Sequence, residues 1–579
     1  MHRIKGSLIS DVAAILIISV ALLSGLIFSG NWPLSHDGLR YLCHLDQFKD
    51  AFDSGILYPR WMPNYYGGYG YPIFVFYQPG YFFFSLLFTY VVPDILAASY
   101  ASNVAMFFLG GTGVYLLVME TSSKNRLFSL FCSVMFLLTP YIYVNMFVRG
   151  DLSELFSMFI IPWAVYFLVK LKDRAVKGEP VLHFAMIISL ILAALVYTHP
   201  FTALFFYPLF CLIIIALSIE MDKKSMIRFI AVAGAALFCA VIFSSPYWIT
   251  AFQMKEYVDY HPAVSGFCLA EKHVVYFNQL FSRAWGFGGS ALGPGDDMSF
   301  QLGLPHFIAA VAGFWLNRKS KLCLSAFILY ILCILMMTPI STIFWKNMPL
   351  VKYVQFPWRL LTVIALLQVI CISGLWKFKE RYPGNLKFYS LISLIMIFTI
   401  AWYSNEFQFK KFDVDLRKAI KYHKKLRLEK FEVYESFNEF LPKTAAAYMP
   451  AIPRGDGAMI EASDTDIKIE EYSDSGPHHM RYKITCAKPQ VIMLNQLYFP
   501  GWKVILDDKV LDDSTLLEKI NKDGRMRIEI SAGDGHYLEA FYEGPPGWYP
   551  RNCVIALVFI SMLVLIMLEQ KKQLKVFSN

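Results

Sequence analysis

Three ionisable residues, His36, Asp37 and Arg40, follow the first apolar segment of the chain. A carboxylate at the edge of a membrane can act as a general base toward a hydroxyl or amine, so Asp37 is a candidate catalytic residue. His36, Arg40 and the later Arg60 are candidates for substrate binding. The spacing also fits a helix cap or a surface ion pair at Asp37, and these alternatives stay open.

A second group is the run Arg149-Gly-Asp151-Leu-Ser-Glu154, between two apolar segments. Charges this close to a membrane are costly unless they pair or serve a function. Arg149 could hold a phosphate, and Asp151 or Glu154 could act in catalysis by orienting an acceptor or a metal ion. The alternative is structural: Asp151 caps a helix and Glu154 completes a capping box.

Two further turns each carry one basic residue of interest. In Val354-Gln-Phe-Pro-Trp-Arg359, a proline favours a helix start just before Arg359, and a helix N-terminus with an arginine suits a phosphate. In Tyr197-Thr-His-Pro200, His199 could move a proton or bind phosphate. The alternatives are an arginine that only reaches lipid phosphates and a histidine that caps or packs.

Two aromatic and glycine-rich stretches could contact a substrate. Asn278–Gly303 contains Asp296 and Asp297, and it predicts a mobile loop over a substrate or, alternatively, an ordinary acidic turn. The aromatics of Tyr65–Phe84 are typical of a membrane-interface belt, although aromatics also stack on sugars or hold a polyprenyl tail. The sequence has no zinc-ligand spacing, P-loop or G-x-S-x-G motif, which disfavours a cytosolic nucleotide-driven machine.

Membrane helices must position these residues. The chain of 579 residues is 56% hydrophobic and 17% charged, which is too apolar for a soluble protein and typical of one that crosses a membrane many times. A bilayer core requires about 20 apolar residues per helix. Such windows predict twelve spans, at Val12–Ser29, Ile95–Met119, Leu127–Val148, Leu155–Lys170, Val181–Thr198, Phe201–Ile219, Phe229–Tyr247, Gln301–Asn317, Leu322–Ile343, Pro357–Trp376, Leu386–Ser404 and Arg551–Leu568.

Basic residues orient these spans. Short loops rich in Lys and Arg are expected in the cytoplasm, and both termini then lie there too, with the candidate site residues on the outer face. Because the basic residues sit in these loops, the net charge of +9 does not indicate nucleic acid. The sequence thus predicts a multi-pass protein of the cell (inner or plasma) membrane with an extracytoplasmic active site. The loops are Lys124–Arg126, Lys170–Lys177, Lys223–Arg228, Arg318–Lys321, Lys377–Lys387 and Lys571–Lys575.

One uncharged segment, Tyr71–Val92, is long enough to span but is interrupted by Pro72, Pro79 and Gly80. We therefore predict that Gln78–Val92 is a helix that lies along, or dips into, the outer surface.

The segment 405–550 has a different pattern. A charged stretch, Phe407–Glu439, favours a helix, and from Ala458 polar and apolar residues alternate in short runs. This alternation, with turn residues between runs, predicts a small β-sandwich. The expected organisation is a membrane domain over 1–404 with outer loops 30–94 and 248–300, an extracytoplasmic β-rich domain over 405–550, and a last span with a basic tail over 551–579.

These motifs resemble a known family. HDG, RGDLSE, the WGFGGS…DDMSFQLG loop and QFPWRLL resemble membrane proteins named for a 6-pyruvoyl-tetrahydropterin synthase-related domain. An acid after the first span, outer surface helices and a later arginine at a helix end are similar to the GT-C superfamily of polyprenyl-phosphate-sugar glycosyltransferases. NQLYFPGWKVILDDK resembles the outer β-domain of bacterial proteins that glycosylate envelope polymers.

The resemblance implies a GT-C-like fold of about 12 transmembrane helices and an inverting glycosyltransferase activity. The donor would be a polyprenyl-phosphate sugar, the other partners would be membrane lipids and an envelope acceptor, and nucleic acid is not expected. Asp37 would be the catalytic carboxylate, and Arg359 would hold the lipid-linked phosphate. Arg149, Asp151 and Glu154 would form a second outer-loop site.

The resemblance leaves the cofactor open. Many relatives in the superfamily have two acids in the first outer loop, whereas Gly38 follows Asp37 here. Whether a divalent cation, Mg²⁺ or Mn²⁺, takes part is therefore undecided, and no metal ligands are assigned.

Two other function classes compete with the enzyme. A transporter or flippase of a lipid-linked anionic substrate predicts ionisable residues in the middle of several spans, and inverted repeats. The sequence shows few such charges and no repeat, which favours the enzyme. The third class is a non-catalytic scaffold for envelope assembly that binds through its β-domain.

Overall fold

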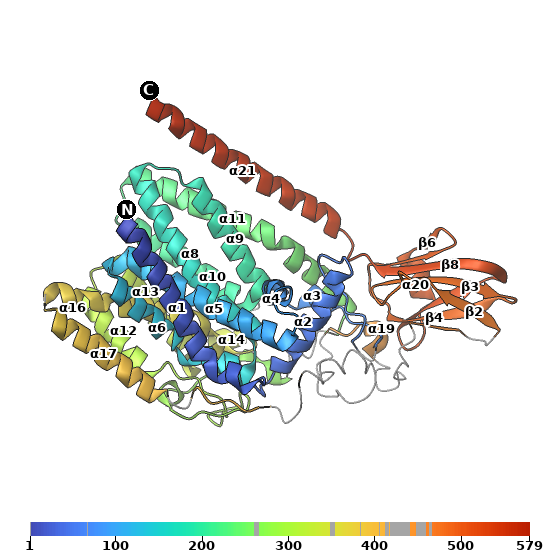
Figure 1. Ribbon diagram of the computed structural model, residues 1–579, viewed down its shortest axis with the longest axis horizontal. Coiled ribbons are helices and arrows are strands. Elements are labelled where there is room, and N and C mark those ends of the chain that lie inside the picture. Colours follow the sequence, from blue (N-terminus) through green and yellow to red (C-terminus); the bar gives the residue numbers. More distant parts are fainter. Residues whose placement is uncertain are drawn as a thin grey trace.

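The computed structural model describes residues 2–65, 68–259, 266–347, 354–382, 384–403, 406–411, 416, 440–446, 459–462 and 466–578. A body of helices carries a β-sheet domain at one end, and both chain ends lie at the opposite end of the body (Figure 1). The predicted architecture, many membrane-length helices with a β-domain late in the chain, is confirmed.

Among the described residues, eight helical segments are long and apolar enough to cross a membrane. Two bent helix pairs pass the same test, and α9 (Leu182–Thr198) and α12 (Leu304–Asn317) are shorter apolar helices. Each of the twelve predicted spans coincides with one of these. The eight segments contain α1 (His2–Ser29), α5 (Ile95–Val118), α8 (Leu152–Lys177), α10 (Pro200–Ser218), α11 (Lys223–Met254), α15 (Leu361–Ile372) with α16 (Trp376–Arg381), α17 (Asn385–Trp402) and α21 (Trp548–Ser578).

Prolines explain the two bent pairs, because proline cannot donate the backbone hydrogen bond of a helix interior. Pro140 separates α6 (Arg126–Leu137) from α7 (Pro140–Tyr143), and the chain then continues through a π-helical turn to Arg149 with a bend of 48°. Pro339 separates α13 (Lys321–Met337) from α14 (Thr342–Asn347) with a bend of 78°.

Burial sorts the helices into centre and rim. Every residue of α15 is buried, so this helix lies at the centre of the body. In contrast, α17 and α21 bury few of their residues, as helices facing lipid do. The helix α11 is longer than its predicted window, Phe229–Tyr247, since hydropathy finds only the apolar part of a helix and α11 has polar ends.

The segment after the first span folds into α2 (Gly38–Asp53), α3 (Ile73–Phe76) and α4 (Gly80–Thr89). The ten residues of α4 reach about 15 Å, half the thickness of a bilayer core. This length agrees with the predicted helix that does not span.

The β-domain has two antiparallel sheets, ordered β1-β4-β7 and β2-β3-β8-β5-β6. Its central pairs set Met480 opposite Ala540 and Ile492 opposite Ile528, all buried, so the predicted alternation does place apolar residues inside. The strands are β1 (Ile460–Ala462), β2 (Ile467–Glu471), β3 (His479–Cys486), β4 (Gln490–Leu497), β5 (Trp502–Leu506), β6 (Lys509–Leu511), β7 (Arg525–Ile530) and β8 (Gly533–Tyr542), with helices α19 (Lys443–Ala446) and α20 (Asp513–Glu518).

Most of the predicted helix Phe407–Glu439 lies outside the described residues. Its first residues, 407–411, are not helical, and Lys411 instead forms an antiparallel bridge with Pro33.

One buried side chain joins the β-domain to the loop between α2 and α3. Gln496 accepts a hydrogen bond from Trp61 Nε1 at 2.7 Å and donates one to the carbonyl of Gly68 at 2.7 Å. The backbone N–H of Leu497 donates to the carbonyl of Tyr69, also at 2.7 Å. The loop and β4 are therefore one packed unit.

Candidate functional site

Three helix starts meet at one place in the structure. Asp151 caps α8, His199 caps α10, and Arg359 lies in the short 3₁₀ helix η11 (Pro357–Leu360) that leads into α15. Glu154 Oε2 lies 3.6 Å from His199 Nε2 and 3.4 Å from Arg359 Nε, so Glu154 links the starts of α8, α10 and η11. Helix starts present free N–H groups and a positive dipole end, so this place favours anions.

The buried guanidinium of Arg149 bridges two carboxylates. Nη2 donates to Asp151 Oδ2 at 2.9 Å, and Nη1 donates to Glu154 Oε2 at 2.8 Å. Nη1 also donates to the hydroxyl of Tyr141 at 3.0 Å and to Asn145. The sequence prediction that these three charged residues form one group is consistent with this geometry.

Glu154 is fully buried and both its oxygens are occupied. Oε1 accepts hydrogen bonds from Tyr141 at 2.5 Å and Thr362 at 2.9 Å, and Oε2 faces Arg149 and Arg359. Its side chain is therefore directed at the arginines.

Asp151 is a helix cap, as the structural alternative predicted. Its Oδ1 accepts the N–H of Glu154 at 3.0 Å and the hydroxyl of Tyr41 at 2.9 Å. Burial raises the pKa of Asp151, but the charge of Arg149, with further contributions from His199 and Arg359, lowers it overall to about 2. Asp151 is thus ionised at any physiological pH.

His199 is a neutral cap that faces Glu154. Its Nδ1 accepts the N–H of Thr202 at 3.2 Å and lies 2.7 Å from Thr202 Oγ1, and its Nε2 lies 3.6 Å from Glu154 Oε2. Burial lowers the pKa of His199 to about 4, although the two nearby carboxylates favour its charged form.

Arg359 has hydrogen-bonding capacity to spare. Its Nη1 donates to the carbonyl of Val354 at 3.0 Å and its Nε faces Glu154 Oε2 at 3.4 Å, while its Nη2 makes no hydrogen bond to the part of the chain described. The faces of the guanidinium lie 4.8 Å from the ring of Phe201 and 5.2 Å from that of Phe356. These rings cover the faces of the guanidinium, which leaves its edge to bind a ligand.

The segment between α1 and α2 lies directly against this cluster. The backbone N–H of Asp37 donates to the carbonyl of Arg149 at 2.8 Å. Gly150 has φ +68°, and a Cβ there would lie 2.4 Å from the backbone N of Gly38. Only glycine permits this approach, which brings the HDG and RGD runs together.

Asp37 itself makes an ion pair. It precedes α2 but makes no capping hydrogen bond, and it lies 3.2 Å from Arg40 with 31% of its side chain exposed. The ion-pair alternative is confirmed and the capping alternative is wrong. The Asp37 carboxylate remains accessible, unlike those of Asp151 and Glu154.

A chain of hydroxyls leads from the buried cluster toward Asp37. Tyr77 donates to Tyr41 at 3.0 Å, and Tyr41 donates to Asp151 at 2.9 Å. The charges of Asp37 and Arg40 both act on Tyr77, as does that of Asp151. The Asp37–Arg40 pair and the buried cluster are therefore electrostatically connected through Tyr77.

The glycine-rich loop packs over the same region. The ring of His36 contacts the backbone of Phe287 and Gly288, and burial lowers its pKa. Asp296 accepts hydrogen bonds from Ser290 and from Gln279 within the loop, so it serves as a turn residue, as the alternative predicted. Trp358 donates to Ser290 at 3.3 Å, which fastens the loop beside η11.

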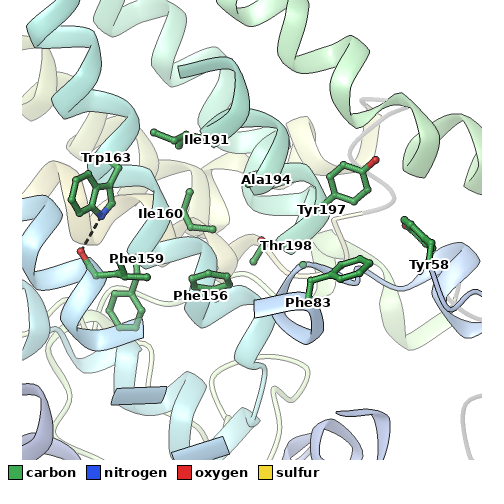
Figure 2. Close-up of a pocket in the computed structure, with 12 residues that line it drawn as sticks. Tyr58, Phe83, Phe156, Phe159, Ile160, Trp163, Ile191, Ala194, Tyr197 and Thr198 are labelled. Carbon is green, nitrogen blue, oxygen red and sulfur yellow. Dashed lines mark hydrogen bonds between the residues drawn. The ribbon is translucent and has the colours of Figure 1, made fainter. Parts of the chain in front are cut away.

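An apolar cavity of about 710 Å³ opens beside the cluster, between α4, α5, α8 and α9. Figure 2 shows Trp163 at one end and Tyr58 with Tyr197 at the other. The indole of Trp163 donates to the carbonyl of Leu109 at 2.9 Å. Phe156 and Thr198 line the cavity, and they lie two residues after Glu154 and one residue before His199 in the chain, so the cavity adjoins the segments that carry the cluster.

Arg60 lies apart from the other candidate residues. Its guanidinium stacks on the rings of Tyr58, at 3.9 Å, and Trp548, at 5.0 Å. Since Tyr58 lines the apolar cavity, Arg60 lies at the edge of this cavity and not in the carboxylate cluster.

Sequence reasoning missed the hydroxyl partners of the cluster. Tyr41, Tyr141 and Thr362 each bind a buried carboxylate. Spacing offered one signal: Tyr41 is four residues after Asp37 and Thr362 three after Arg359, so each shares a helix face with a candidate.

Comparisons with solved structures give distant matches. The arabinofuranosyltransferase AftD from Mycobacteria is 14% identical, with a TM-score of 0.45 over 70% of this chain and 27% of that one. The Archaeoglobus fulgidus oligosaccharyltransferase tethered with an acceptor peptide is 13% identical, with a TM-score of 0.42 over 71% of this chain and 55% of that one. The same organism's AglB, in complex with an inhibitory peptide and a dolichol-phosphate, is 11% identical, with a TM-score of 0.43 over 72% and 59%. The chain thus spans less than two thirds of the length of each.

No match to the chain is found among curated proteins. Residues 74–408, more than half of the chain, match the profile of a membrane protein family. They cover the Arg149–Glu154 run, His199 and Arg359. The predicted resemblance is confirmed: the chain belongs to the family of membrane proteins described by a 6-pyruvoyl-tetrahydropterin synthase related domain.

Proposed function

We propose that this protein is an integral membrane glycosyltransferase that moves a sugar from a polyprenyl-phosphate donor to an envelope acceptor. One observation carries the proposal: a buried arginine cluster at three helix starts adjoins, along α8 and at the end of α9, the lining of an apolar cavity. Such a site complements a molecule with an anionic head and a long apolar tail. The head would lie at Arg359 and the tail between Thr198 and Trp163.

Arg359 is the residue best placed to hold the phosphate. Its Nε faces Glu154, but its Nη2 makes no hydrogen bond among the described residues, whereas both terminal nitrogens of Arg149 donate to carboxylates. As the bond from the anomeric carbon to the phosphate oxygen breaks, negative charge grows on the leaving phosphate. A preorganised guanidinium stabilises that charge.

Asp37 is the proposed general base. It is the carboxylate of the site that keeps solvent access, with 31% of its side chain exposed. It would take the proton of the acceptor hydroxyl or amine while that group bonds to the anomeric carbon from the face opposite the phosphate, which inverts the configuration. Asp151 and Glu154 would hold the arginines in place.

The proposed setting is the cell membrane. Both chain ends lie at the end of the helical body away from the β-domain (Figure 1), in accord with cytoplasmic termini and an outer active site. The β-domain, bonded to the outer loop through Gln496, would cover the site or position the acceptor.

The test is sugar transfer by the purified protein in lipid nanodiscs, with a radiolabelled polyprenyl-phosphate sugar and envelope extract as acceptor. We expect Asp37→Asn to reduce transfer by a factor of at least about 100. The matched control is Asp53→Asn, which alters a carboxylate paired with Lys49 on the same helix and should leave transfer unchanged.

Two results would contradict the proposal. Transfer that persists in Asp37→Asn would remove Asp37 from the chemistry. Movement of the labelled donor across the membrane without any transfer would instead favour the flippase class.

A further inference from the structure

Asp151, Glu154 and His199 form a group that resembles a metal site. Each offers a ligand atom, all three are buried, and these atoms lie within 4.8 Å of one another. Two carboxylates and one imidazole are a donor set that divalent transition metals accept. The question is which cation the group holds in this protein.

A guanidinium already occupies the position between the two carboxylates. Arg149 donates to Asp151 Oδ2 at 2.9 Å and to Glu154 Oε2 at 2.8 Å. The other oxygen of each carboxylate accepts hydrogen bonds as well, from Tyr41 at 2.9 Å and from Tyr141 at 2.5 Å. A metal ion between the two carboxylates would have to displace the guanidinium of Arg149.

The histidine is already engaged at Nδ1. That atom accepts the N–H of Thr202 at 3.2 Å and lies 2.7 Å from Thr202 Oγ1. Only Nε2, 3.6 Å from Glu154 Oε2, faces the acids, and it could bind a metal only in the form that carries no proton there.

The charges are also balanced without a metal. Asp151 and Glu154 supply two negative charges, and Arg149 and Arg359 supply two positive ones within 3.4 Å of them. A divalent ion would add two positive charges to a buried site that already contains two guanidiniums, with repulsion that the protein interior screens poorly.

We propose that Arg149 takes the place of a divalent cation in this protein, so that the site works without a metal ion. Arg149 is then a positioning residue: its guanidinium holds the two acids and supplies the positive charge beside Arg359. The inference rests on contacts within the chain and stands or falls independently of the transferase proposal.

The test measures Mn²⁺ binding to the full-length protein in detergent, after chelator treatment, from the loss of the free Mn²⁺ paramagnetic resonance signal. Wild-type protein should take up no equivalent. Removing the guanidinium while keeping the length of the side chain, in Arg149→Met, should tighten Mn²⁺ binding at least about tenfold. Adding Asp151→Asn to Arg149→Met should abolish the gain.

The matched control is Arg126→Met. Arg126 also holds a carboxylate, that of Asp11, with distances of 2.6 and 2.7 Å. Among the residues the structure describes, Asp11 is not part of a three-ligand group, so this variant should gain no Mn²⁺ binding.

Two results would overturn the inference. One is wild-type protein that binds one equivalent of Mn²⁺ and loses it in Asp151→Asn, a comparison that decides the matter even if Arg149→Met does not fold. The other is Arg149→Met protein that binds Mn²⁺ no more tightly than Arg126→Met.

Discussion

Glu154 is the carboxylate with which both arginines of the site are paired, and Glu154→Gln tests how the buried charges are balanced. The substitution keeps the shape of the side chain and an oxygen for the hydroxyls of Tyr141 and Thr362. It removes the negative charge 2.8 Å from Arg149 and 3.4 Å from Arg359. Asp151 alone then faces two guanidiniums.

The expected cost follows from the burial of the group. Removing one partner of a buried ion pair costs about 3–5 kcal/mol. Because the glutamine oxygen still accepts hydrogen bonds, we place Glu154→Gln at the lower end, about 3 kcal/mol. At about 2 °C per kcal/mol this loss lowers the unfolding midpoint by about 6 °C.

The assay is thermal unfolding of the detergent-solubilised protein, followed by tryptophan fluorescence. The control, Glu120→Gln, alters a partly exposed pair with Lys170, 3.3 Å apart, and should cost less than about 1 kcal/mol. In Glu154→Gln with Arg359→Gln the charge is balanced again, so the double variant should cost at least about 1 kcal/mol less than the sum of the single ones. Equal midpoints for Glu154→Gln and Glu120→Gln, or strictly additive losses, would refute the reasoning.

Two further predictions concern pH and packing. Burial lowers the pKa of His199 to about 4, from about 6.5 in the unfolded chain. Between these two values the unfolded protein binds a proton that the folded protein does not bind. The free energy of unfolding should therefore fall by about 2 kcal/mol between pH 7.5 and pH 5. The assay measures the unfolding midpoint as a function of pH. The variant His199→Asn, which keeps a capping oxygen, should reduce this pH dependence, and an equal pH dependence in the variant would show that another group causes it. At Gly80 a Cβ would lie 2.6 Å from Thr198 Oγ1 and 2.8 Å from its backbone N, so Gly80→Ala should cost about 1–3 kcal/mol. The same change at Gly25, where nothing lies within 4 Å, should cost nothing in the same unfolding assay, and equal losses at both sites would show that the contact at Gly80 is unimportant.

The helices and their caps could be predicted because their causes are local. Apolar runs must form helices in a membrane, where no water satisfies the backbone. Likewise, an aspartate before a helix satisfies its first N–H groups, and Asp151 does so.

Partners far along the chain could not be predicted. Thr362 and Glu154 lie 208 residues apart, and no local pattern announces their hydrogen bond. The same limit explains Arg60, which was grouped with the site by its chemistry alone. Its neighbours are Tyr58 and Trp548, and the second of these belongs to the last helix.

The bond between Trp61 and Gln496 joins residues 435 positions apart, and this sets an order on biosynthesis. The ribosome must complete nearly every membrane helix before Gln496 exists. Until then the loop between α2 and α3 lacks its partner strand. Growth of the chain thus delays the packing of this loop until most of the protein has been made.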